Sequence, residues 1–183
     1  MMPLARIPAS QDLPNEINVI IEIPKDSDPV KYEVDKDTGA IFVDRVLTAP
    51  MRYPCNYGYV PNTLCGDGDP LDVMVVMPVP LIPGSVIRSR PIGYLKMTDE
   101  AGCDEKVIAV PIGKVFPAYR NITTVRDLPE LTLDRIEHFF AHYKDLERNK
   151  WVKIEGWRDA VEARQLVLDS VAAYQAAPDK PNF

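Results

Sequence analysis

The alternation of apolar and polar positions divides the chain into a strand-rich first part and a helical last part. Short apolar runs, rich in β-branched residues and separated by Gly, Pro and Asp, occur at residues 17–23, 30–34, 41–45, 73–77, 86–90, 92–96 and 106–111. Runs of this length with turn residues between them are typical of strands. The runs 30–34 and 41–45 flank a turn-forming stretch that ends at Gly39, which predicts a β-hairpin.

The last third of the chain shows the spacing of amphipathic helices. A first helix is predicted from Asp127, where Glu130 completes the spacing of a capping box. Its apolar stripe consists of Leu133, Ile136, Phe140 and Tyr143. A second helix is predicted from Asp159, with Glu162 completing its box, and it stops at Pro178. Many short strands followed by two helices predict an α+β fold, a small β-barrel with two C-terminal helices packed on it.

Composition indicates one ordinary folded domain. The chain has 183 residues, of which 46% are apolar and 26% charged, and it contains no internal repeat or linker, so we expect a single domain over residues 1–183. The formal net charge of −6 argues against non-specific binding to nucleic acid or to anionic membranes. The longest apolar stretch, residues 73–82, is interrupted by Pro78 and Pro80 and is too short to span a bilayer.

Cysteine usage favours a cytoplasmic protein. The three cysteines, Cys55, Cys65 and Cys103, are odd in number and lack CxxC spacing, so we expect reduced thiols and no disulfide framework. The first ten residues lack the apolar core of a signal peptide, and we therefore expect none.

The sharpest local feature is the acidic segment Asp67-Gly-Asp-Pro-Leu-Asp72. Three carboxylates this close repel one another, so they are exposed to water, have raised pKa values, or bind cations. An EF-hand loop is excluded, because Leu71 and Asp72 stand where that loop needs Asp or Asn and then Gly. A solvated acidic turn is the alternative to a cation site.

A second acidic group surrounds Gly102 at a predicted turn, and it consists of Asp99, Glu100, Asp104 and Glu105. Taken alone, this second group is also typical of a solvated loop. Together the two groups supply many hard oxygen donors without His or Cys among them, which favours Mg²⁺, Mn²⁺ or Ca²⁺ over Zn²⁺.

Basic and tyrosine side chains form a third set. They lie on two predicted strands, in the tyrosine-rich segment 51–59 and near the end of the first helix, and they include Lys31, Arg45, Tyr53, Tyr57, Tyr59, Tyr143 and Lys144. Each alone can be a surface or core residue, but Lys, Arg and Tyr also donate hydrogen bonds to anionic oxygens. Combined with the carboxylates, they suit a polyanionic substrate that metal ions bridge to the protein, as in phosphoryl transfer.

These residues carry a resemblance to a known family. The segment Asp67–Asp72 and an ordered series of further motifs, collinear over residues 12–177, resemble family I inorganic pyrophosphatase, the soluble bacterial type. Among those motifs are Tyr53-Pro-Cys-Asn-Tyr-Gly-Tyr59 and Lys150-Trp-Val-Lys-Ile-Glu-Gly-Trp157. The resemblance implies a five-stranded OB-like barrel, a hexamer built as a dimer of trimers, and Mg²⁺-dependent hydrolysis of pyrophosphate to two orthophosphates without a covalent intermediate.

The resemblance also implies a role for each matching residue. Asp69 would be the general base that deprotonates the attacking water. The implied metal ligands are Glu33, Asp67, Asp72, Asp99 and Asp104, for three to four Mg²⁺ ions with Mn²⁺ or Zn²⁺ as substitutes. Phosphate oxygens would be bound by Lys31, Arg45, Tyr57, Lys106, Tyr143 and Lys144. Glu22 and Tyr53 would support the site.

Two rival functions use part of the same pattern. An OB-fold nucleic-acid binder would stack bases on barrel aromatics, although the acidic balance argues against it. A non-catalytic Ca²⁺ module would use the carboxylates alone, and neither rival uses the Lys, Arg and Tyr set. His138 and His142 lie four apart on the first predicted helix, where they are simple neighbours, weak zinc ligands or part of a pH-sensitive subunit interface.

Overall fold

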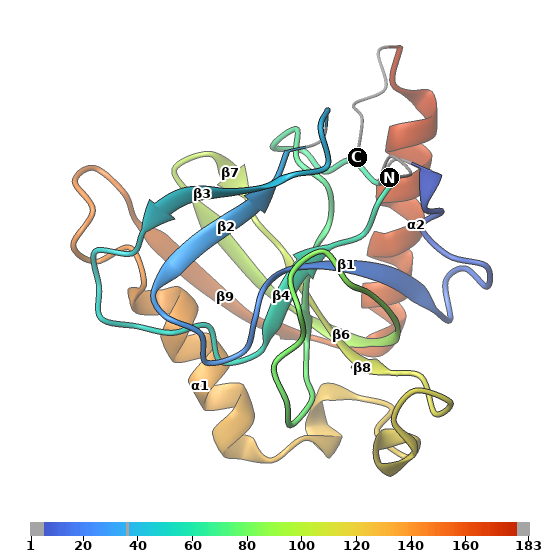
Figure 1. Cartoon of the computed structure of the whole chain (residues 1–183). Helices are drawn as coiled ribbons and strands as arrows, with labels where there is room; N and C mark the ends of the chain where they lie inside the picture. The colour runs from blue at the N-terminus through green and yellow to red at the C-terminus, as the bar shows by residue number, and fades with distance from the viewer. Residues whose placement is uncertain (1–5, 36, 179–183) are drawn as a thin grey trace.

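The computed structural model describes residues 6–35 and 37–178 and has an α+β fold (Figure 1). The main sheet contains β1 (Ile17–Ile23), β4 (Asn56–Tyr59), β5 (Asp72–Val75), β6 (Val86–Asp99), β7 (Gly102–Cys103), β8 (Lys106–Pro111) and β9 (Val152–Arg158). A separate two-stranded sheet pairs β2 (Val30–Val34) with β3 (Ile41–Val46). The helical elements are η2 (Pro117–Tyr119), η3 (Val125–Asp127), α1 (Glu130–His142) and α2 (Ala160–Ala176).

Five strands of the main sheet close into a ring, as the sequence predicts. The strand β1 pairs with β4, β4 with β5, β5 with β8, β8 with β6, and β6 with β1 again. Only the β5–β8 pair within this ring is parallel. Ring closure removes the exposed edges that an open sheet would leave.

The strand β6 is one long element where the sequence predicts two. The prediction divides it at Pro91, because proline is disfavoured inside strands. In the structure Pro91 opposes Ala109 of β8, and the register shifts between Pro91 and Gly93. Gly93 has a φ of 154°, and a Cβ there would lie 2.6 Å from the carbonyl oxygen of Arg158. The irregularity lets β6 continue past the proline and contact β9.

The helices confirm the predicted pair but correct the start of the first one. The side chain of Asp159 caps α2 by accepting hydrogen bonds from the backbone of Val161 and Glu162, as predicted. By contrast, α1 begins at Glu130 after Pro129 and has no side-chain cap. Asp127 instead completes a capping box with Thr124 around η3, so the predicted box from Asp127 to Glu130 is wrong.

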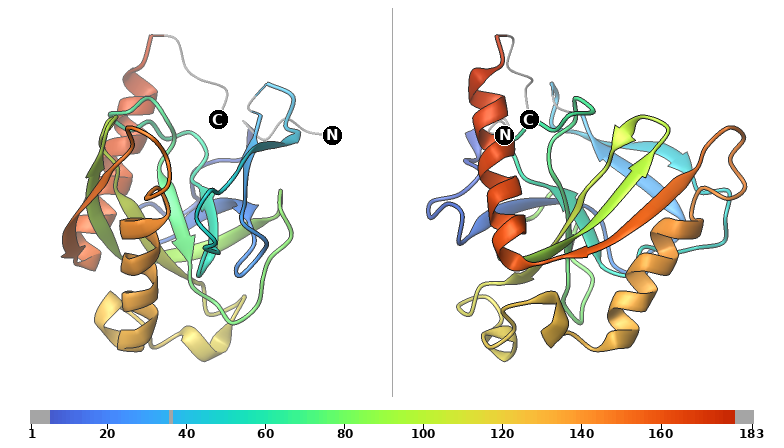
Figure 2. Two further views of the ribbon diagram at one scale, coloured as in Figure 1. Left: turned by 90° about the vertical axis from the view of Figure 1, so that its left-hand side faces the viewer. Right: turned by 180° about the vertical axis from the view of Figure 1, so that it is seen from behind.

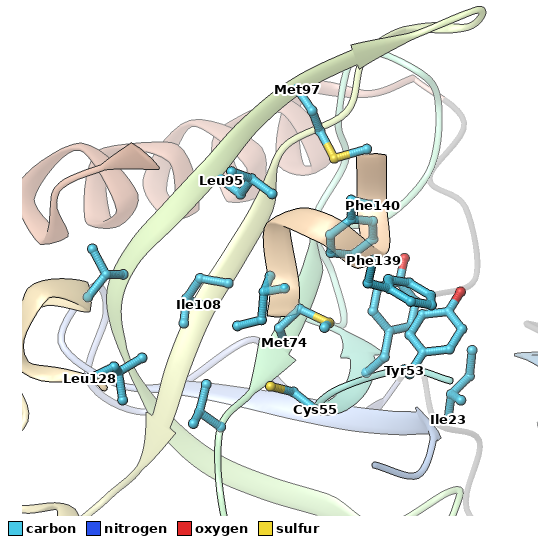
Figure 3. Packing of buried hydrophobic residues seen from close by; sticks show 14 of the residues in the cluster. Ile23, Tyr53, Cys55, Met74, Leu95, Met97, Ile108, Leu128, Phe139 and Phe140 are labelled. Atoms are coloured by element: carbon cyan, nitrogen blue, oxygen red, sulfur yellow. The ribbon is translucent and has the colours of Figure 1, made fainter. Parts of the chain in front are cut away.

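The core that anchors α1 lies directly beneath its aromatic face (Figure 3). Phe139 and Phe140 belong to a buried cluster with Met74, Leu95 and Ile108 of the sheet. The ring of Tyr53 packs 4.5 Å from that of Phe139, measured between centroids. This packing fixes the end of α1, which leads into Tyr143 and Lys144.

The helices and the β2–β3 sheet lie on different sides of the ring, as the left view of Figure 2 shows. The strand β2 packs against β1. The β2–β3 sheet and the ring therefore bracket the surface on which the acidic segment lies. No helix in the part of the chain that the structure describes is long and apolar enough to cross a membrane.

Candidate active site

A polar cavity of about 400 Å³ opens between the β2–β3 sheet and the ring. It is lined by Glu22, Lys31, Glu33, Val34, Asp35, Phe42, Tyr57, Tyr59, Asp69, Pro70 and Asp72. Six of the residues predicted from sequence, from four strands and one loop, are thus brought to one wall. The remaining predicted residues do not line the cavity, but Asp67, Lys106 and Tyr53 contact residues that do.

The acidic segment forms the loop between β4 and β5. Gly68 has a φ of +92°, a left-handed conformation that glycine adopts without strain. The carboxylate of Asp67 accepts a 3.0 Å hydrogen bond from the backbone N–H of Asp69, which fixes the turn. Burial raises the pKa of Asp67 and the nearby Asp69, Asp72 and Asp104 charges add to this, against the hydrogen bond. The carboxylates therefore share one electrostatic environment.

Lys106 of β8 joins this acidic group to the core. Its side chain is 5% exposed, and its Nζ contacts the carboxylates of Asp72 and Asp104. The same Nζ lies 3.4 Å from the hydroxyl of Tyr57. Burial acts to lower the pKa of Lys106, but the charges of Asp72 and Asp104 outweigh it and raise the pKa well above its usual value. The ammonium is therefore held charged between two carboxylates.

A second buried ion pair links the end of α1 to the tip of β6. The Nζ of Lys144 lies 2.6 Å from Asp99 and 3.3 Å from Glu100. Lys144 is buried, so it is not the plain surface lysine that the sequence alone also allowed. Burial acts to raise the pKa of Asp99, but the hydrogen bonds from Lys144 and from the backbone N–H groups of Ala101 and Gly102, together with the Lys144 charge, outweigh it and lower the pKa. Tyr143 beside it stacks on Phe139 at 5.2 Å.

The third group of charges lies on the β2–β3 sheet. Lys31 and Arg45 are register partners across the two strands. The Nζ of Lys31 contacts Glu33 and lies 3.4 Å from Asp44. Asp44 also lies 3.1 Å from Nη1 of Arg45, so it bridges the two cations. Asp44 was not predicted as a site residue. Its position next to Arg45 on a strand is the sequence feature that could have indicated it.

Glu22 and Tyr53 hold the surrounding elements together. The buried carboxylate of Glu22 accepts a 2.8 Å hydrogen bond from the backbone N–H of Val34, which ties β1 to the end of β2. The ring of Tyr53 lies 5.0 Å from that of Tyr57. Burial raises the pKa of both tyrosines well above the usual value, so their hydroxyls stay protonated donors.

Two lining residues, Asp35 and Phe42, were missed from sequence. They reach the cavity only because the hairpin folds over the ring, and no local pattern marks them. The histidines lie apart from the cavity: their rings are 4.5 Å apart on α1, and Nδ1 of His142 lies 2.8 Å from Asp145. Cys55, Cys65 and Cys103 are free thiols.

The donor set fits a hard divalent cation by chemistry, but it is not assembled as a closed cage. Within residues 6–35 and 37–178, no three His, Cys, Asp or Glu side chains converge into a metal-binding group. The ammonium of Lys106 contacts Asp72 and Asp104 and compensates their charge. All the candidate donors around it are carboxylate oxygens, the ligands that Mg²⁺ prefers.

Comparison with known proteins agrees with this site. The family profile described as "Inorganic pyrophosphatase" matches residues 19–175. The chain is 61% identical to the inorganic pyrophosphatase of Xanthomonas campestris over 175 residues, which is 96% of this chain and 98% of that protein. It is 58% identical to the Pseudomonas aeruginosa inorganic pyrophosphatase over 174 residues, which is 95% of this chain and 99% of that protein.

Solved structures show the same likeness. The crystal structure of the inorganic pyrophosphatase from Thermus thermophilus superposes with a TM-score of 0.90 at 41% identity, covering 96% of this chain and 100% of that one. The inorganic pyrophosphatase from Coxiella burnetii gives 0.88 at 50% identity, covering 91% and 99%. The match runs through the acidic loop, the paired cations and both helices, and the chain belongs to the family I soluble inorganic pyrophosphatases.

Proposed function

We propose that this chain hydrolyses inorganic pyrophosphate to two orthophosphates at the cavity between the β2–β3 sheet and the ring. The observation that carries the proposal is the direct pairing of cations with carboxylates: Lys31 contacts Glu33 in the cavity wall, Lys106 contacts Asp72 from behind that wall, and Lys144 pairs with Asp99 at the end of α1. Pyrophosphate is a polyanion, so its oxygens need cationic partners. Cations are also needed to offset the repulsion between the substrate and the carboxylates of the cavity wall. Membership of the pyrophosphatase family supports the same reaction.

The proposed cofactor is Mg²⁺, with three to four ions per site. Glu33, Asp67, Asp72, Asp99 and Asp104 would hold it, because they supply the hard oxygen donors around the cavity. When bound, the metal would neutralise phosphate charge and lower the pKa of a coordinated water. Mn²⁺ or Zn²⁺ are the proposed substitutes.

Asp69 is the proposed general base. Its side chain lines the cavity, and its backbone is fixed on both sides: its N–H donates to Asp67, and its carbonyl accepts from the N–H of Cys65 at 2.8 Å. A carboxylate held at the cavity wall can accept a proton from an attacking water without being consumed. Water attack needs no covalent intermediate.

The remaining proposed residues bind the substrate and keep it oriented. Lys31, Arg45, Lys106 and Lys144 would donate to phosphate oxygens as cations, and the protonated hydroxyls of Tyr57 and Tyr143 would donate as neutral groups. Glu22 and Tyr53 would act indirectly, by holding β2 and α1 against the ring. Each of the three lysines is already paired with a proposed metal ligand, so the same charges serve both substrate and cofactor.

Assembly, location and domain organisation complete the proposal. We infer a single domain over residues 1–183 and a hexamer built as a dimer of trimers. Exposed apolar side chains on β3 and in the loop before β6 support an interface, among them Val43, Val46 and Ile82. A cytoplasmic location is proposed from the free thiols.

The test is phosphate release from pyrophosphate by the purified chain. With Mg²⁺ present we expect fast release, with EDTA none, and with ATP as parallel substrate little. A folded sample that releases no phosphate from pyrophosphate would overturn the proposed reaction. Metal-dependent melting without turnover would then favour a Ca²⁺-binding module, and a salt-sensitive shift with single-stranded DNA would favour a nucleic-acid binder.

A further inference from the structure

Glu147 contacts two of the proposed phosphate-binding residues, Arg45 through its carboxylate and Lys144 through its backbone. It belongs to the segment 143–150 that follows α1. Its backbone N–H donates a 2.8 Å hydrogen bond to the carbonyl of Lys144, so it stands one turn beyond that lysine. Its side chain is only 11% exposed, which is low for a glutamate in a loop.

The carboxylate of Glu147 faces the guanidinium of Arg45 on β3. Its Oε1 lies 3.4 Å from Nε of Arg45, and its Oε2 lies 3.1 Å from Nζ of Lys150. Within the described residues, both the Nε and the Oε1 are buried atoms without a hydrogen-bond partner. The two atoms belong to oppositely charged groups and are 3.4 Å apart. Charge-assisted hydrogen bonds are about 2.7–2.9 Å long, so a small movement brings Nε and Oε1 to hydrogen-bond distance.

Arg45 is contacted on a second nitrogen as well. Its Nη1 lies 3.1 Å from Asp44, the neighbouring residue on the same strand. A guanidinium is planar and rigid, so contacts at Nε and Nη1 fix the whole plane. Of these two contacts, the one from Glu147 comes from a distant part of the chain.

We propose that Glu147 is a positioning residue that orients Arg45 for its phosphate contact and ties β3 to the segment carrying Lys144. Two cations from separate elements are thereby held at one spacing, as a substrate with two phosphoryl groups requires. The inference rests on the proposed function, because it takes Arg45 and Lys144 as substrate-binding groups. It adds a residue that neither touches the substrate nor holds a metal.

The first measurement is steady-state kinetics of Glu147→Ala and Glu147→Gln with pyrophosphate. The alanine variant releases Arg45, and we expect KM to rise about tenfold with a smaller change in kcat, since a positioned binding contact is lost. The glutamine variant keeps the shape and an acceptor oxygen but loses the charge, and we expect a rise of about threefold. An unchanged KM in both variants would overturn the proposal.

The second measurement separates positioning from a merely structural role. Lysine at position 45 keeps a positive charge but has no Nε, so Glu147→Gln is repeated in an Arg45→Lys background. We expect the effect of Glu147→Gln on kcat/KM to shrink below twofold there. The same factor in both backgrounds would mean that Glu147 acts on the loop and not through Arg45.

Controls keep the outcomes distinct. Glu130→Gln removes one negative charge from an exposed position on α1 and should leave KM unchanged. Thermal melting of each variant identifies loss of folding, and if Glu147→Ala unfolds, the isosteric Glu147→Gln decides the test. An inactive unmodified chain would overturn the proposed function and this inference with it, whereas an active chain with an unshifted KM overturns the inference alone.

Discussion

At the scale of single residues, the site is a set of reciprocal pairs. Lys106 stays charged in a buried position only because Asp72 and Asp104 neutralise it, and the carboxylates in turn tolerate one another because of the lysine. Asp99 and Lys144 repeat the arrangement at the end of α1. The pKa values of Lys106 and Lys144 are raised and that of Asp99 is lowered, so these three groups remain ionised near neutral pH.

The Asp99–Lys144 pair gives a prediction for acid stability. The folded-state pKa of Asp99 is lowered, so its contribution to the free energy of unfolding is present above the unfolded value of about 3.8 and disappears as pH falls through the lowered folded value. We expect Asp99→Asn to reduce the free energy of unfolding at pH 7 by about 1.5–3 kcal/mol, the range for a hydrogen bond to a charged group. At an acidic pH below the unfolded value of 3.8 the difference should shrink.

The measurement is urea unfolding in EDTA at both pH values. Asp134→Asn, at an exposed position of α1, is the matched control and should change stability little at either pH. A loss for Asp99→Asn that is as large at low pH as at pH 7 would show that the pair's charge does not stabilise the fold.

At the scale of elements, the strand β4 lies between β1 and β5 in the ring and carries Tyr57, which lines the cavity. Its neighbour Gly58 packs directly on β1, because a Cβ at this position would lie 1.9 Å from the carbonyl oxygen of Ile20. No rotamer relieves a contact between a Cβ and backbone. The close approach of β4 to β1 at Gly58 therefore fixes the position of the neighbouring Tyr57 relative to the cavity.

We expect Gly58→Ala to destabilise the protein by about 3 kcal/mol or more, because overpacking against backbone forces the strands apart. Gly66 is a matched control in the loop before Asp67, where a Cβ would meet no atom within 4 Å. Gly66→Ala should change stability by less than about 1 kcal/mol. Thermal or denaturant unfolding of both variants checks this, and equal effects would mean that the β1–β4 approach is adjustable.

The elements also show what the sequence can and cannot predict. Runs rich in Ile and Val, such as β1 and β8, are visible because their composition favours strands. The strand β4 was missed because Asn-Tyr-Gly-Tyr is bounded by Pro and Gly and looks like a loop, and β9 was missed because charged residues interrupt it. The acidic loop was found because its carboxylates are adjacent in sequence. Asp44, Phe42 and Glu147 depend on how the hairpin crosses the ring.

At the scale of the whole molecule, the ring and the β2–β3 sheet must stay together for the cavity to exist. Glu22 links β1 to β2, and Glu147 with Arg45 links β3 to the segment after α1. The cavity therefore depends on contacts between distant parts of the chain.

We expect Ca²⁺ to support much less turnover than Mg²⁺. Ca²⁺ takes six to eight oxygens in loose geometry, whereas Mg²⁺ demands a compact octahedral arrangement, and the proposed chemistry needs a tightly placed water. Phosphate release at equal metal concentrations measures the difference. High activity with Ca²⁺ alone would contradict the proposed site.

The assembly can be measured directly. If the chain forms the proposed hexamer, light scattering should give a mass six times that of the 20.6 kDa chain. If the exposed His138 and His142 belong to a pH-sensitive interface, that mass should fall between pH 8 and pH 5. A mass that is constant over this range would exclude a pH-sensitive interface at the two histidines. A monomer at all pH values would contradict the hexamer.

The most direct test of the central claim compares kcat with Mg²⁺ affinity in Asp69→Asn. General-base catalysis contributes about 10²–10⁴-fold, so we expect kcat to fall about a hundredfold or more. Mg²⁺ affinity, measured by calorimetry without substrate, should change by less than about threefold, because Asp69 is proposed to contact the attacking water and not the metal. Equal losses of kcat and Mg²⁺ affinity would contradict it and make Asp69 a metal ligand.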